Sequence, residues 1–279
     1  MNAVLIAVAV FIFGTVVGSF LNVVILRQSL GGKRHRRSIC LSCGVEIENR
    51  DLFPVVSFFM LKGRCRNCKS RISLQYPVVE VLTGLFFVLA YQHSRLYEPL
   101  ALALADGLTL AAIGAVLAVI FVYDLRHKII PDWSAVALAF LALLRVSIMF
   151  GLSGELLSLA FLWQVLAGAF AAAPFFFLWL FSGGKWMGLG DAKLMIGLGI
   201  LLGYRLWLPA IAISFWLAAI VVLGLMAVAR LLPRGSAFKK LAALDRKSEV
   251  PLGPFLIAGS LLTFWFTANI NSVFFFLMM

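Results

Sequence analysis

Residues 3–26 read AVLIAVAVFIFGTVVGSFLNVVIL, an apolar run that contains no charged residue. A helix rises about 1.5 Å per residue, so a run of this length can cross the roughly 30 Å of hydrocarbon in a bilayer. No basic residue precedes the run and no small-residue cleavage site ends it. We therefore expect a retained transmembrane helix here rather than a signal peptide.

The same pattern recurs along the rest of the chain. The composition agrees, since 63% of the residues are apolar and 13% are charged, whereas soluble domains are about half apolar and a quarter charged. This excludes a soluble enzyme, a disordered tail, a collagen and a disulfide-rich secreted module. We predict an all-α polytopic membrane protein with about eight transmembrane helices. The further runs are 77–92, 100–123, 133–150, 156–181, 192–202, 206–229 and 252–276.

Two of these runs are weak. Run 192–202 is short, and run 77–92 contains Glu80. The distribution of positive charge nevertheless favours a count of eight. With eight crossings, segments 27–76, 124–132, 182–193 and 230–250, which hold 21 of the 24 Lys and Arg residues, fall on one side of the membrane.

The positive-inside rule makes the side that carries this charge the cytoplasm, so both termini are expected outside. Lys and Arg together number 24 against 12 Asp and Glu. We attribute the excess to orientation and to contact with anionic membrane lipid, and we expect no nucleic-acid partner.

Segment 27–76 is polar and basic, and it holds all four cysteines as two C-x2-C pairs. Two such pairs can supply four thiolates to one tetrahedral site, which favours structural zinc, and Gly44 suits a left-handed turn after the first pair. Two disulfides or an iron–sulfur cluster are the alternatives, and disulfides conflict with a cytoplasmic location. The proposed ligands are Cys40, Cys43, Cys65 and Cys68.

The chain is thus expected to contain a first transmembrane helix at 1–26, a small cytoplasmic zinc domain at 27–76 and a transmembrane catalytic domain at 77–279.

Two aspartates are predicted at the cytoplasmic ends of different spans. Asp124 ends the run at 100–123, and Asp191 precedes the run at 192–202. Close carboxylates cannot both ionise easily, so one can donate a proton while the other activates water. Peptide hydrolysis needs both roles. For Asp191 the alternative is that it only caps the helix that follows.

Other residues near this face have several possible roles. Gly188 and Gly190 can bring backbone close to a substrate or adopt positive φ. Lys193 can tune the pair, bind an acidic substrate residue or extend to the headgroups. Glu80 can bind a substrate amine or pair with a basic side chain. Asp132 is expected to cap the helix that begins beside it.

Six motifs, in order along nearly the whole chain, resemble the bacterial prepilin peptidases (type IV leader peptidases) of the GxGD class of membrane aspartyl proteases. The resemblance implies that Asp124 and Asp191 are the catalytic pair. It also implies that type IV prepilins or pseudopilins are cleaved at the cytoplasmic face of the bacterial inner membrane. Many members then methylate the new N-terminus with S-adenosylmethionine. The motifs are 18–24 GSFLNVV, the cysteine pairs, 76–80 YPVVE, 124–132 DLRHKIIPD, 188–194 GLGDAKL and 251–256 PLGPFL.

The residues alone leave three rival functions. A metal-dependent transferase acting on lipid phosphates would hold Mg²⁺ with clustered acids, whereas the acids here stand singly. A proton-coupled transporter tends to place its carboxylates near the bilayer midplane rather than at the face. A membrane-anchored zinc adaptor would not need the two aspartates.

Overall fold

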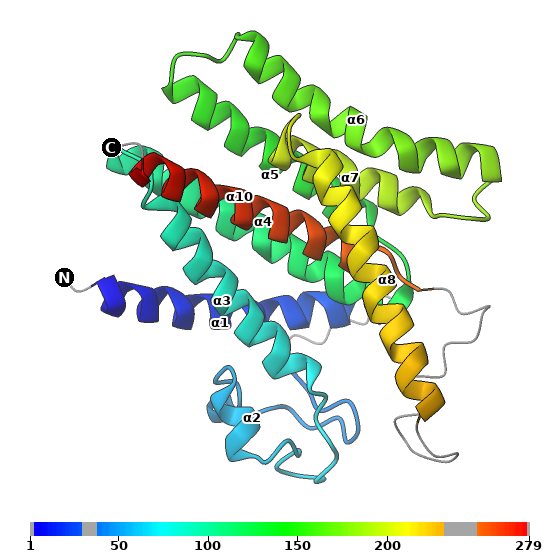
Figure 1. The fold of residues 1–279 in the computed structure, drawn as a ribbon. Coiled ribbons are helices and arrows are strands. Elements are labelled where there is room, and N and C mark those ends of the chain that lie inside the picture. The colour runs from blue at the N-terminus through cyan, green and yellow to red at the C-terminus, as the bar shows by residue number, and fades with distance from the viewer. Residues whose placement is uncertain (1–2, 30–37, 232–249, 278–279) are drawn as a thin grey trace. The chain divides into compact units, whose positions relative to one another are not determined.

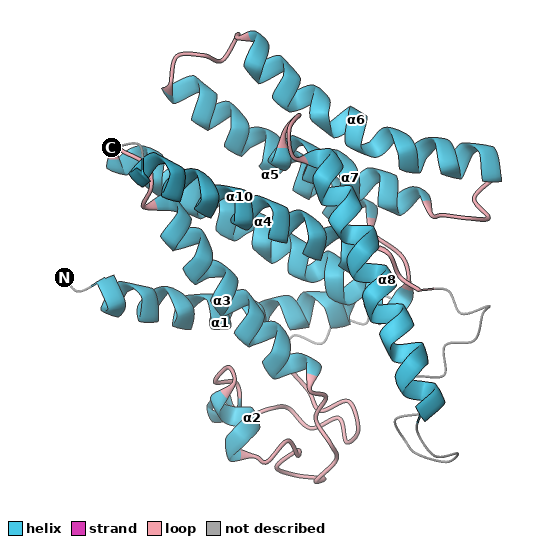
Figure 2. Ribbon diagram, viewed as in Figure 1, coloured by secondary structure: helices cyan, strands magenta, loops and turns pink. Residues whose placement is uncertain are grey.

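The computed structural model describes residues 3–29, 38–231 and 250–277. In these residues the chain forms helices and loops but no strand (Figure 2). The basic residues predicted on the cytoplasmic side in 30–37 and 232–249 lie outside the described part. The helices, labelled as in Figure 1, are α1 (Ala3–Ser29), the 3₁₀ turn η1 (Asn49–Asp51), α2 (Val56–Met60), α3 (Gln75–Ser94), α4 (Leu100–His127), α5 (Asp132–Leu152), α6 (Leu159–Ser182), α7 (Leu189–Leu202), α8 (Trp207–Leu231) and α10 (Gly253–Leu277).

Each of the eight apolar runs coincides with one helix, which confirms the all-helical prediction. Within the described residues five of these helices are long and apolar enough to cross a membrane by themselves: α1, α4, α5, α6 and α8. The other three, α3, α7 and α10, match the two weak runs and the last run. A count of eight crossings is therefore approximate.

The chain divides into two compact units, Met1–Val122 and Tyr123–Met279. The last residues of α4, including Asp124, belong to the second unit. The predicted domain boundaries at residues 26 and 76 lie where the composition changes rather than where these two units meet. They stay a prediction.

In the first unit α1 packs against α3 through glycines. A Cβ on Gly14 would lie 2.8 Å from the Cα of Gly84, and a Cβ on Gly18 would lie 2.7 Å from the Cα of Glu80. Gly14 and Gly18 are four residues apart, the small-xxx-small spacing that lets two helix backbones approach closely in a membrane. Any larger side chain at these positions would separate the two helices.

In the second unit α7 packs against both α5 and α6. A Cβ on Gly197 would lie 2.6 Å from Leu138 of α5, and one on Gly199 would lie 2.6 Å from the carbonyl oxygen of Ala167 in α6. Most of α7 is buried. A helix enclosed in this way by protein can be apolar all round and short, which explains the weak run at 192–202.

Candidate active site

Asp124 lies in the last turn of α4, and its carboxylate is fixed by the backbone at the start of α10. The side chain is only 4% exposed. The N–H of Gly253 donates to its Oδ2 over 3.0 Å. The backbone amide of Gly253 thereby fixes one of the two carboxylate oxygens, Oδ2.

Gly253 is needed here for its small size. A Cβ at this position would lie 2.5 Å from Asp124 Oδ2, too close for any real carbon–oxygen contact. The motif at 251–256 by itself predicts no role for this glycine. The structure gives it one, because a side chain at this position would collide with the carboxylate that its amide binds.

Asp191 lies in the first turn of α7 and belongs to the same unit as Asp124. The two carboxyl groups are close enough for their negative charges to act on each other. The first turn of a helix also favours an acidic residue, because the unpaired N–H groups there carry partial positive charge. The structure thus gives the two predicted aspartates an electrostatic coupling.

The capping predictions for the aspartates are wrong in detail. Helix α7 begins at Leu189 with Gly188 as its N-cap, so Asp191 is the third helical residue rather than the cap. Helix α5 has Pro131 at the N-cap, and Asp132 is its first residue without a side-chain capping bond. In both cases the helix includes polar residues that precede the apolar run.

The two glycines of the GLGD motif have ordinary backbone angles, so the expected positive φ is wrong for both Gly188 and Gly190. At Gly190 an added Cβ would lie 3.1 Å from the Cβ of Ile130, whereas a close approach of either glycine to a substrate stays a prediction. Ile130 is buried and also lies beside Gly253. This side chain, which the sequence did not single out, fills the space between the starts of α7 and α10.

Lys193 has a partner in the protein, since its Nζ lies 2.6 Å from Oδ1 of Asp132. The Asp132 side chain is 76% exposed and the Lys193 side chain is 38% exposed. Exposed ion pairs contribute little to stability, so we interpret this one as a link between the starts of α5 and α7.

Because this pair is exposed, a double-mutant cycle with Lys193→Met and Asp132→Asn should give a coupling free energy of about 0–1 kcal/mol in thermal unfolding. Each single variant should keep cleavage activity within about tenfold of the unchanged protein, because a free-energy change of about 1 kcal/mol alters a rate by less than a factor of ten. A loss of about 10²-fold or more in the Lys193→Met variant, the size usual for a general acid or base, would instead show that Lys193 takes part in the cleavage reaction.

Glu80 belongs to the first unit, and its side chain is 6% exposed. Its Oε2 accepts the N–H of Val55 over 2.7 Å, and its Cα lies against Gly18 of α1, where an added Cβ would come within 2.7 Å. The contacts found for Glu80 are thus to the cysteine segment and to α1.

The four cysteines converge as predicted. Their Sγ atoms all lie within 4.8 Å of one another, and all four are free thiols, so the disulfide alternative is wrong. Cys40 Sγ and Cys68 Sγ are 3.8 Å apart, which matches the sulfur spacing around a tetrahedral zinc with Zn–S bonds of about 2.3 Å.

The two cysteine pairs have equivalent backbones. The N–H of Gly44 donates to the carbonyl of Cys40, and the N–H of Lys69 donates to the carbonyl of Cys65. Both Gly44 and Lys69 adopt positive φ, so the left-handed turn predicted after the first pair also follows the second. Backbone N–H groups of Cys43 and Ser42 lower the pKa of the Cys40 thiol to about 6, which favours the metal-binding thiolate.

Comparisons with known proteins agree with this arrangement. Residues 12–94 match the bacterial peptidase A24 N-terminal domain, and residues 111–223, which include both aspartates, match the type IV leader peptidase family. A prepilin leader peptidase/N-methyltransferase of Aeromonas hydrophila is 30% identical and aligns over 92% of this chain and 89% of its own length. The chain belongs to the type IV leader peptidase family.

Two further relatives carry the same name. The Klebsiella pneumoniae protein is 35% identical over 70% of this chain and 84% of its own length. The Pectobacterium carotovorum subsp. carotovorum protein is 33% identical over 77% of this chain and 81% of its own length. No solved structure matches the chain. As a type IV leader peptidase, the chain is a membrane peptidase with several transmembrane helices, located in the inner membrane.

Proposed function

We propose that the protein removes the leader peptide of type IV prepilins or pseudopilins at the cytoplasmic face of the membrane and then methylates the new N-terminus. The observation that supports this best is the pair of coupled aspartates at the ends of two helices, inside the region that matches the peptidase family. The curated relatives named prepilin leader peptidase/N-methyltransferase support the choice of substrate.

The chemistry assigned to the pair is direct attack of water on the scissile carbonyl. One carboxylate, Asp124 or Asp191, takes a proton from the water, and the other carboxyl donates a proton to the leaving amine. Sharing one proton between two close carboxyls supplies both forms at neutral pH. The Gly253 N–H holds Asp124 in one rotamer while this occurs.

The substrate proposed here has a basic leader followed by an apolar helix. Its cleavage point would lie at headgroup depth, because Asp124 is in the last turn of the apolar helix α4 and Asp191 is in the first turn of α7. In the orientation set by positive charge, these ends face the cytoplasm and both termini face outward.

Co-expression with a prepilin, followed by mass spectrometry of the pilin N-terminus, tests both activities at once. The expected product lacks the basic leader and carries one added methyl group. Cleavage without methylation would remove the transferase half of the proposal, and an intact leader would refute the peptidase half. The residues that bind S-adenosylmethionine are left unassigned.

For the cysteine domain, taken as residues 27–76, we propose structural zinc held by the four converging thiolates. A closed Cys₄ site has no open position for substrate, so the metal would fold the segment rather than act in cleavage. The segment has a small apolar interior, which makes its folding dependent on the metal.

Because four ligands share one ion, Cys65→Ser is expected to lower zinc from one equivalent per chain to nearly none, measured by metal analysis of the purified full-length protein. Leu41→Ala, a change between two ligands, is the matched control and should keep the metal. Full zinc content in the Cys65→Ser protein would contradict the site.

A further inference from the structure

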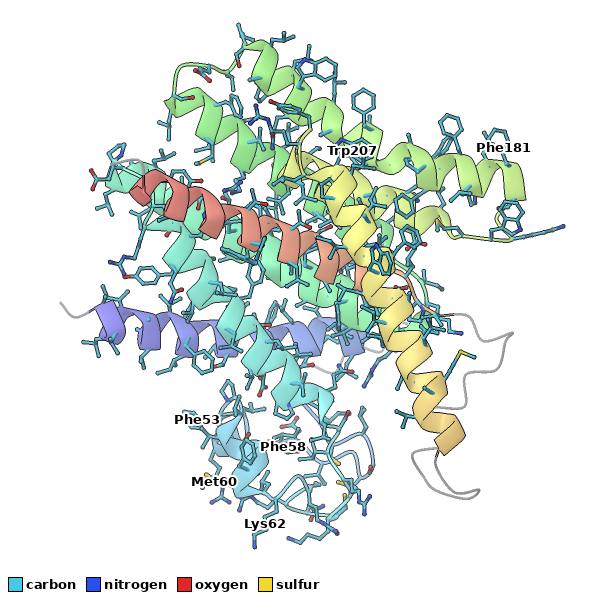
Figure 3. The ribbon with its side chains drawn as sticks, viewed as in Figure 1. Phe53, Phe58, Met60, Lys62, Phe181 and Trp207 are labelled. Atoms are coloured by element: carbon cyan, nitrogen blue, oxygen red, sulfur yellow. The ribbon has the colours of Figure 1, made fainter. Side chains whose placement is uncertain are left out.

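The cysteine segment carries a cluster of exposed apolar side chains, which we call the α2 patch. It lies on the nine residues from the end of η1 through α2, and exposed fractions range from 42% to 76%. Figure 3 shows Phe53 and Met60 at α2. So many large apolar groups left open on so short a segment indicate a surface that contacts something apolar. The patch consists of Leu52, Phe53, Val56, Phe59 and Met60.

The patch is held beside the transmembrane helices rather than beyond their ends. Val55, in the middle of the patch, donates its N–H to the carboxylate of Glu80, and the backbone of Glu80 lies against Gly18 of α1. Gly18 lies nine residues before Arg27, the basic residue in the last turn of α1. At about 1.5 Å per residue, the contact between Gly18 and Glu80 is roughly 13 Å deeper along α1 than Arg27.

The backbone at Val55 is bent sharply to make this contact. Val55 has φ 61° and ψ −52°, and the N–H of Val56 donates to the carbonyl of Pro54 over 2.6 Å. This is the rare γ-turn with positive φ, which is strained for a β-branched residue. The buried Glu80 carboxylate holds the central N–H of the turn, so the patch has a fixed position next to α1 and α3.

The charges that follow the patch suit an anionic lipid surface. Lys62, Arg64, Lys69 and Arg71 are all exposed. Basic residues near a bilayer are attracted to anionic headgroups, while apolar side chains beside them enter the boundary between headgroups and acyl chains to a depth of about 5–10 Å. The patch and its basic flank together form such a surface.

We propose that the α2 patch inserts into the leaflet of the protein's own bilayer at the side where α1 ends and α3 begins. The cysteine domain is then a membrane-embedded element, anchored by Phe53, Val56, Phe59 and Met60 in lipid. An apolar helix of a protein substrate is the other occupant that such a patch could accept. The depth of the Glu80 contact and the basic flank favour lipid.

A photoreactive benzoylphenylalanine placed at Phe59, and separately at Phe53, tests this in the full-length protein. The protein is reconstituted in nanodiscs of phosphatidylethanolamine and phosphatidylglycerol, irradiated, and searched for lipid adducts by mass spectrometry. The same probe at Leu41, which is 62% exposed on the same segment, is the matched control. The expected result is several-fold more acyl-chain adducts at Phe59 and Phe53 than at Leu41.

Adduct yields at Phe59 and Phe53 no higher than at Leu41 would overturn the proposal. So would a loss of the lipid adducts, in favour of cross-links to pilin, when a prepilin is added to the nanodiscs. The measurement needs no catalysis, so its result does not depend on whether the proposed peptidase function is correct. Unchanged thermal unfolding of each probe-bearing protein shows that the exposed substitutions leave the fold intact.

Discussion

Asp124→Asn and Asp191→Asn are each expected to lower the rate of prepilin cleavage by about 10²–10⁴-fold, the usual contribution of a general acid or base. An amide can neither accept the proton of the attacking water as a carboxylate does nor protonate the leaving amine. The measurement is cleavage of a prepilin in membranes that contain equal amounts of each variant. Because the proposed mechanism has the two residues share one proton, the double variant should be little worse than either single one.

Asp132→Asn is the matched control for this test, since Asp132 is exposed and pairs with Lys193 rather than with the aspartate pair. It should cleave at a rate close to that of the unchanged protein. Near-normal cleavage by either Asp124→Asn or Asp191→Asn would refute the catalytic pair.

Gly253→Ala is expected to lower kcat by about 10²-fold while leaving KM little changed, because small misplacements of a catalytic group have effects of this size. The added Cβ would lie 2.5 Å from Asp124 Oδ2 and would push the carboxylate off the Gly253 amide. The backbone angles of Gly253 are ordinary, so alanine itself is tolerated by the helix start. Steady-state cleavage of a purified prepilin separates the two constants.

The control is Gly224→Ala, a glycine in α8 whose Cβ would meet no atom within 4 Å. It should leave kcat unchanged, and helix propensity should stabilise the chain by up to about 1 kcal/mol. Equal kcat for Gly253→Ala and the unchanged protein would mean that Asp124 does not depend on this contact.

Apolar length was enough to predict the helices, because lipid selects continuous apolar runs and the backbone must pair internally within them. Apolar length did not predict the residue at which each helix starts. Helix α7 begins at Leu189 rather than at residue 192, since helical hydrogen bonding continues into the polar GLGD turn that a hydropathy pattern excludes. Cysteine spacing predicted that the four thiols converge, because two short C-x2-C pairs need only come together.

The contacts that the sequence did not reveal all involve backbone groups or partners distant in the chain. Gly253 and Asp124 are 129 residues apart, and the donor is an amide that every residue except proline carries. The Val55 amide that donates to Glu80 is likewise a backbone group, so the sequence gives no sign of this contact. Lys193 and Asp132 bear recognisable charges, but 61 intervening residues allow many other pairings. Only the fold selects among these possibilities.

The glycine contact between α1 and α3 has a consequence for how the cysteine domain assembles. Contacts at Gly14, Gly18 and Gly84 involve no metal, so the two helices can associate as soon as both are inserted in lipid. The chain between Ser29 and Gln75 is then a loop tethered at both ends. Closing such a loop lowers its conformational freedom before any metal binds, so the proposed zinc ion would meet the four sulfurs at a raised effective concentration.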